Sequence, residues 1–75
     1  MAGNLIRLDT KEYGIIYTRP ECVRMLGDKG NGVTVVGILM GPDHAMDVTV
    51  DGEVDEVAAM FETNAPGMFR IYRVN

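Results

Sequence analysis

The spacing of the hydrophobic residues changes near Asp51, and this change constrains the fold more than any other feature of the sequence. Met46, Val48 and Val50 alternate with polar residues, which is the period of a strand with one buried face. Directly after them, four apolar residues recur at helical spacing and form one stripe: Val54, Val57, Ala58 and Phe61. A strand followed at once by an amphipathic helix predicts a domain of the α+β class.

The other apolar segments predict further strands and a second helix. The expected elements are, in chain order, a strand at 13–18, a short helix from Pro20 to Leu26, two strands at 33–40 and 46–50 that form a hairpin, a helix at 53–63 with Asp51 as its N-cap, and a strand at 68–74. This is the order of the ferredoxin-like fold, so we expect a βαββαβ two-layer sandwich with both helices on one face of an antiparallel sheet. With 75 residues, the chain has room for one such domain, residues 1–75. Residues 4–9 are not part of these six elements and fit an additional edge strand.

The segment from Val33 to Met40 is apolar on both faces of its predicted strand. In the ferredoxin-like strand order, 4-1-3-2, this segment is an edge, and edges are normally blunted by charge or proline. A sheet that helices cover on one side needs only one apolar face, so the second face requires a cover. We therefore expect a homodimer that packs sheet against sheet. The alternative is that the strand at 4–9 folds over the same face.

Several segments resemble small proteins of the dimeric α/β-barrel superfamily. The resembling segments are YGIIYTRPEC near the N-terminus, the apolar strand that ends in GPDH, the alternating MDVTVD, the Gly52-Glu53 pair that opens an Ala-rich helix, and the terminal FRIYRV. The resemblance implies a ferredoxin-like protomer that dimerises sheet against sheet. That superfamily contains monooxygenases, isomerases and haem enzymes, so membership would not decide the function.

Charge and composition exclude several functional classes. A net charge of −4 and a pI near 4.7 argue against nucleic-acid binding, which needs a basic face. One cysteine and one histidine leave no disulfide framework and no metal cluster, and we expect no cofactor. No apolar run approaches the ~20 residues of a membrane span, and no leader pattern is visible. We therefore expect a cytoplasmic protein that does not contact a membrane.

A small-molecule site would use aromatic and basic side chains near the predicted first and last strands. These strands are neighbours in the expected topology, so Arg19 could hold an anion together with Arg70 or Arg73, beside Tyr17 and Tyr72. Solvated arginines are the simpler explanation.

Two side chains are candidates for catalysis. His44 is the one residue whose charge ordinarily changes near neutral pH, so it is the candidate general base, although it lies in a predicted turn. Cys22, flanked by Arg19 and Arg24 at a predicted helix start, is a candidate reactive thiol. A small core cysteine is the interpretation we favour.

The charged residues are distributed unevenly along the chain. Between Gly30 and Phe69 there is no lysine or arginine, and seven acidic residues occur there. Three of them point away from the apolar stripe of the predicted helix: Asp55, Glu56 and Glu62. This acidic face either keeps the protein soluble or docks a basic protein partner.

We expect a self-associating interaction module without turnover. The alternative is a cofactor-free enzyme or ligand-binding protein with a pocket near Tyr17, Arg19, His44 and Tyr72.

Overall fold

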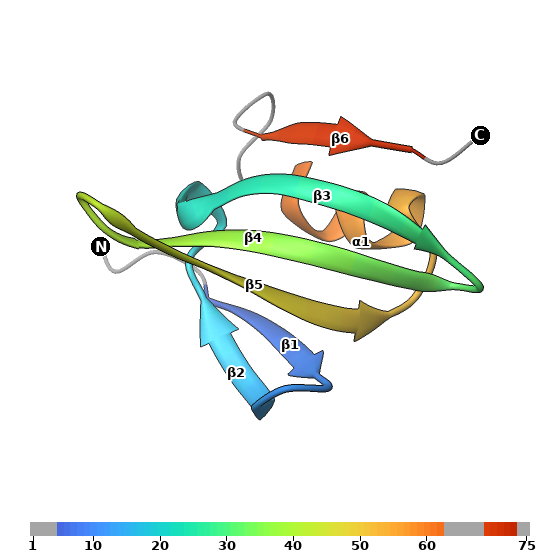
Figure 1. The fold of residues 1–75 in the computed structure, drawn as a ribbon, viewed down its shortest axis with the longest axis horizontal. Coiled ribbons are helices and arrows are strands. Elements are labelled where there is room, and N and C mark those ends of the chain that lie inside the picture. Colours follow the sequence, from blue (N-terminus) through green and yellow to red (C-terminus); the bar gives the residue numbers. More distant parts are fainter. Residues whose placement is uncertain (1–4, 63–68, 74–75) are drawn as a thin grey trace.

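The computed structural model describes residues 5–62 and 69–73, and it consists mainly of one six-stranded sheet (Figure 1). The strands are β1 (Ile6–Thr10), β2 (Gly14–Thr18), β3 (Val23–Gly30), β4 (Val33–Gly41), β5 (His44–Asp51) and β6 (Arg70–Tyr72). A single 3-10 turn, η1 (Pro20–Cys22), precedes β3, and the one α-helix of the described residues, α1 (Val54–Glu62), follows β5. The strand order is β2-β1-β5-β4-β3-β6, in which β3 and β6 are parallel and the other neighbours are antiparallel.

The predicted ferredoxin-like sandwich is wrong, because the segment expected to form the first helix is largely a strand. Pro20–Cys22 form one helical turn, and β3 begins at Val23. The register between β3 and β4 shifts between Val23 and Met25, as in a β-bulge. A bulge moves the alternation of side chains by one residue. Val23 and Leu26 are therefore both fully buried although they are three residues apart, a spacing that imitates a helix.

The strand predicted at 33–40 is not an edge strand, which corrects the argument for a dimer formed by sheet faces. β4 lies between β3 and β5 and pairs with both. Val36 and Ile38 on one face belong to the core. On the other face, a Cβ on Gly37 would lie 2.8 Å from Met25 Cγ, because the Met25 side chain covers that glycine. The second face of β4 is thus partly covered by side chains of its own sheet.

The two hairpins of the central sheet follow local turn chemistry. Gly41 pairs with His44 across a turn of Pro42 and Asp43, so the predicted hairpin is confirmed, with strands longer than expected. Asn31 and Gly32 connect β3 to β4 with φ values of 58° and 71°. Two successive positive φ values are what a type I′ hairpin turn requires, and Asn-Gly is its preferred sequence.

The predicted apolar stripe of the second helix is confirmed. Val54, Val57, Ala58 and Phe61 are all buried in the core, together with residues of the sheet. The N-cap is Glu53 and not Asp51, which is the last residue of β5. The Glu56 carboxylate accepts a hydrogen bond from the Glu53 N–H at 3.1 Å, which is one half of a capping box. The helix was predicted to reach Thr63, and that residue lies outside the described part of the structure.

The segments at both ends of the chain form strands near the predicted positions. The leftover segment at 4–9 corresponds to β1, but β1 lies inside the sheet, between β2 and β5, and is not an edge. The predicted final strand at 68–74 corresponds to β6, and residues 68 and 74 lie outside the described residues. The true edges of the sheet are therefore β2 and β6.

Candidate functional site

The hairpin of β1 and β2 is joined to the rest of the sheet mainly at its turn. β1 pairs with β2 along its whole length, but it meets β5 at one residue pair, Thr10 and Val50. The Lys11 N–H extends this contact by donating a hydrogen bond to the Thr49 carbonyl oxygen at 2.9 Å. Figure 1 shows the hairpin on the side of β5 away from β4.

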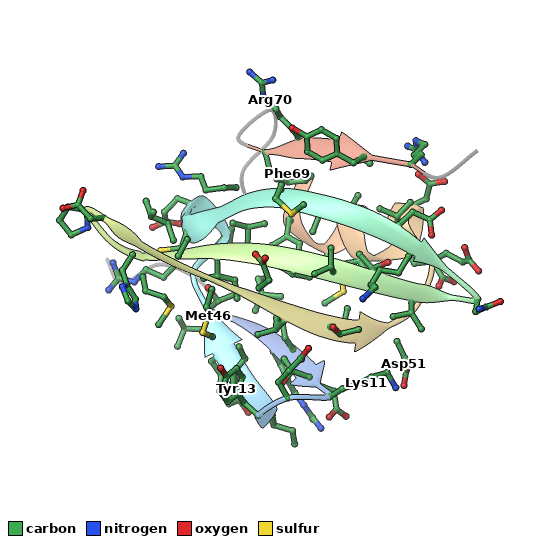
Figure 2. All side chains as sticks on the ribbon, viewed as in Figure 1. Lys11, Tyr13, Met46, Asp51, Phe69 and Arg70 are labelled. Atoms are coloured by element: carbon green, nitrogen blue, oxygen red, sulfur yellow. The ribbon has the colours of Figure 1, made fainter. Side chains whose placement is uncertain are left out.

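Glu12 strengthens the attachment of this turn to β5. Its carboxylate accepts hydrogen bonds from the Thr49 hydroxyl at 2.7 Å and from the Thr49 N–H at 2.8 Å. These two bonds, the hydroxyl bond first, lower the pKa of Glu12 below its ordinary value of 4.5. Beside them, Lys11 Nζ lies 3.0 Å from Asp51 Oδ1 in an exposed ion pair (Figure 2). The hairpin is thus held at one end by polar contacts.

The outer face of β2 carries a row of exposed apolar side chains, which we call the β2 stripe. It consists of Tyr13, in the turn just before the strand, and of Ile15 and Tyr17 within the strand, and these side chains are exposed by 62%, 51% and 62%. Leu8 and Ile16 lie on the opposite face of the hairpin and pack into or against the core. No residue of β2 is charged. An uncharged edge strand with large exposed side chains is unusual in a protein that stays monomeric.

A hollow of about 310 Å³ lies next to the end of the β2 stripe. Its walls include Tyr17 and Arg19 from the end of β2, Cys22 from η1, and Leu39 and Met40 from β4. The structure therefore brings together Tyr17 and Arg19, two of the predicted ligand-binding residues. Cys22 is a half-buried free thiol here, in a 3-10 turn of three residues and not in a longer helix.

A second groove, of about 440 Å³, lies between β1, the end of β5 and α1. Its apolar lining is Leu8, Val50, Val57 and Met60, and its charged lining is Arg7, Asp9, Lys11 and Asp51. Sequence reasoning missed this groove because it assigned residues 1–12 no functional role. The signal in the sequence was the alternation of Leu8 and Thr10 with Arg7, Asp9 and Lys11.

The other predicted ligand-binding residues lie elsewhere. Arg70 and Tyr72 belong to β6, at the opposite edge of the sheet from β2, so the first and last strands are not neighbours. Figure 2 shows Arg70 and Tyr13 on opposite sides of the molecule, at the top and the bottom of the view. His44 is exposed beside the β4–β5 turn and lines neither hollow. The four residues Tyr17, Arg19, His44 and Tyr72 are not brought together into one pocket.

The predicted acidic surface of the helix is partly used within the chain. Asp55 Oδ1 lies 2.7 Å from Arg73 Nη1, and Glu56 caps the helix as described above. The side chain of Glu62 lies outside the described part of the structure. Among the described residues, no three His, Cys, Asp or Glu side chains form a group that could hold a metal ion. In the same part of the chain, no helix combines the length and the apolar character needed to cross a membrane.

No protein-family model, no curated protein and no solved structure matches this chain. The resemblance to the dimeric α/β-barrel superfamily implied a ferredoxin-like protomer, and the observed strand order differs from that fold. The two hollows and the β2 stripe are therefore the features of this chain that can support a function.

Proposed function

We propose that this protein is a small interaction module, without catalytic turnover, that binds protein through the β2 stripe. One observation carries the proposal. Among the described residues, seven large hydrophobic side chains are exposed, and four of them lie between Leu5 and Tyr17. Exposed apolar residues that gather in one segment of the chain mark a contact surface more reliably than scattered ones do.

Strand addition is the binding mode that suits this surface. β2 is an edge strand, so no described strand pairs with its outer side. An extended segment can add to such an edge through main-chain hydrogen bonds, while pockets for alternate side chains give specificity. The hollow beside Tyr17 and Arg19 provides such a pocket at one end of the strand.

The acidic helix is a weaker candidate for the partner surface. Asp55 already pairs with Arg73, and the Glu56 carboxylate already bonds to the backbone at the helix start. A basic partner would have to compete with both contacts. Binding of a basic protein to this helix is therefore the alternative that the experiment below distinguishes from binding to the β2 stripe.

The candidate catalytic side chains lack the support that turnover requires. General acid–base catalysis needs a side chain that a second group orients. Within the described residues, no side chain is hydrogen-bonded to the His44 imidazole, and His44 lines neither hollow. A cytoplasmic location completes the proposal, because the unpaired thiol of Cys22 remains reduced there.

A second candidate function is the binding of a small molecule in the groove between β1 and α1. Its volume of about 440 Å³ lies within the range of about 300–1,000 Å³ that ligand sites occupy. The apolar floor of Leu8, Val57 and Met60 and the neighbouring Arg7 and Lys11 would suit an amphipathic anion.

A selection from a random-peptide display library tests the proposal. We expect enriched peptides to be apolar and β-forming, to bind the wild type, and to lose at least about tenfold in affinity on Tyr17→Ser. Tyr72→Ser is the matched control, since Tyr72 is an exposed tyrosine on the other edge strand. Peptides that bind Tyr17→Ser normally but do not bind Asp55→Lys would show that the acidic helix, and not the β2 stripe, is the binding surface. A thermal-shift screen with medium-chain carboxylates, scored against Arg7→Ala, tests the second candidate.

A further inference from the structure

We infer that β2 pairs with β2 of a second copy of this chain, antiparallel and centred on Ile16, so that two six-stranded sheets join edge to edge. The inference rests on the proposed function, because it names the partner of the same β2 stripe. The dimer differs from the one predicted from the sequence, which packed sheet faces together. Here the contact is made by an edge strand.

The described strands that have unpaired backbone on one side differ in their protection. β6 has three residues and carries Arg70, with Arg73 directly after it. The part of β5 that β1 does not reach carries Asp47. Short length and charge are the usual ways to keep an edge from pairing with another chain. β2 is five residues long, uncharged and without proline, so it is the unprotected edge.

In β2, the backbone N–H and C=O groups of the stripe residues point toward the open edge of the sheet. Lys11 donates its N–H to β5, so odd-numbered residues of β1 direct their backbone groups toward β5 and even-numbered ones toward β2. Even-numbered residues of β1 pair with even-numbered residues of β2, as Leu8 does with Ile16. The N–H and C=O groups of Ile15 and Tyr17 therefore face the open edge.

An antiparallel pairing centred on Ile16 uses all five residues of β2. It places Gly14 opposite Thr18 and Ile15 opposite Tyr17, each pair occurring twice by symmetry. Ile15 and Tyr17 then exchange main-chain hydrogen bonds, and their side chains meet on the same face as an aromatic and β-branched pair. One residue pair further, Tyr13 lies opposite Arg19, and a guanidinium beside a tyrosine ring is favourable. Arg19 also lines the hollow, so the second copy approaches its mouth.

The charge distribution favours this edge for contact between like-charged copies. Each chain carries a net charge of −4, so two copies repel one another. Residues 5–19, which include the hairpin, carry three basic and two acidic side chains, whereas residues 30–69 contain seven acidic ones and no lysine or arginine. Repulsion is therefore weakest when the copies meet through the N-terminal hairpin, with β4, β5 and α1 turned away. Two paired strands of five residues bury a small area compared with most specific interfaces, so we expect a dissociation constant of about 10–100 µM.

Sedimentation equilibrium of three proteins tests the inference. The wild type should show a reversible monomer–dimer equilibrium, and Ile15→Lys should remain monomeric, with a dissociation constant raised at least about tenfold. Ile15 is exposed, so the variant is expected to fold, which circular dichroism checks. Tyr72→Lys, on the other edge strand, is the matched control and should dimerise as the wild type does. A wild type that is monomeric at about 1 mM, or dissociation by Tyr72→Lys and not by Ile15→Lys, overturns the inference.

Disulfide trapping tests the register. In a Cys22→Ala background that retains the dimer, Ile15→Cys mixed with Tyr17→Cys should crosslink under mild oxidation, since these positions lie opposite one another. Either variant alone should crosslink several-fold less. Equal crosslinking of Ile15→Cys with itself contradicts the register centred on Ile16. If the wild type is monomeric but the selected peptides still depend on Tyr17, the second copy is not the partner and the proposed function stands. If the wild type is monomeric and peptide binding does not depend on Tyr17, the inference and the proposed function are both wrong.

Discussion

β4 pairs with β3 on one side and with β5 on the other over nearly its full length, whereas β1 meets β5 at a single residue pair. The central strands and α1 also supply most of the buried core, to which the hairpin contributes Leu8. The hairpin is held instead by its turn, through Lys11, Glu12 and Asp51. The central sheet and α1 therefore provide most of the buried core, and the hairpin is the part of the sheet that exposes the β2 stripe.

The largest expected effect comes from the core under the central sheet. Phe61 is fully buried and meets Phe69 edge to face, with ring centroids 6.1 Å apart. Phe61→Ala should lower the free energy of unfolding by about 3–5 kcal/mol, measured by urea denaturation. Leu8→Ala in the hairpin should cost about 2 kcal/mol, at the low end for a buried leucine, because β1 can relax away from β5. Equal costs at the two positions would contradict the division into a stable body and a loosely attached hairpin.

A smaller effect is expected on the outer face of the central sheet. A Cβ on Gly37 would approach Met25 Cγ at 2.8 Å, so Gly37→Ala must displace the Met25 side chain. We expect a loss of about 1–3 kcal/mol in thermal or urea unfolding. Gly41→Ala is the control in the same strand, because the nearest atom to its Cβ is 4.0 Å away. If Gly37→Ala is neutral, this face packs less tightly than described.

Glu12 tests the attachment of the hairpin, with a local effect. Glu12→Gln should speed amide exchange in β1 and β2 and leave β4 unchanged, as read by hydrogen–deuterium exchange. Because the folded-state pKa of Glu12 lies below 4.5, the unfolded chain binds more protons in that range, and stability falls as the pH drops from about 4.5. Glu12→Gln should flatten this part of the pH profile. An unchanged profile would mean that the Thr49 contacts do not stabilise the ionised carboxylate.

The smallest effect is expected for the ion pair between α1 and the residue after β6. Arg73 and Asp55 approach to 2.7 Å, but both side chains are more than half exposed. Arg73→Ala should change the stability by less than about 0.5 kcal/mol, and the difference should shrink with added salt. Lys11→Ala, at the exposed pair with Asp51, is the comparison in the hairpin. A loss above 1 kcal/mol for either variant would show that the pair does more than join two exposed charges.

Features that depend on local periodicity were predictable. The alternation at Met46, Val48 and Val50 belongs to β5, and the stripe that ends at Phe61 is the buried face of α1. The turn after Gly41 forms the predicted hairpin. Each of these follows from a repeat of apolar residues or from turn chemistry within about ten residues, so the sequence alone was sufficient.

The strand order and the candidate site required the tertiary structure. A bulge at Val23–Met25 gives β3 a helical spacing of buried residues, and nothing local distinguishes the two cases. Whether Tyr13, Ile15 and Tyr17 are exposed depends on which strand ends the sheet, and that is decided by pairing between residues far apart in the chain. Apolar side chains on an inner strand are core, and the same side chains on an edge are a binding surface. The sequence by itself determined β5, the β4–β5 hairpin and the buried face of α1, because each follows from a local repeat or turn. Only the long-range pairing decided that residues 23–30 form a strand and that β2 is the edge.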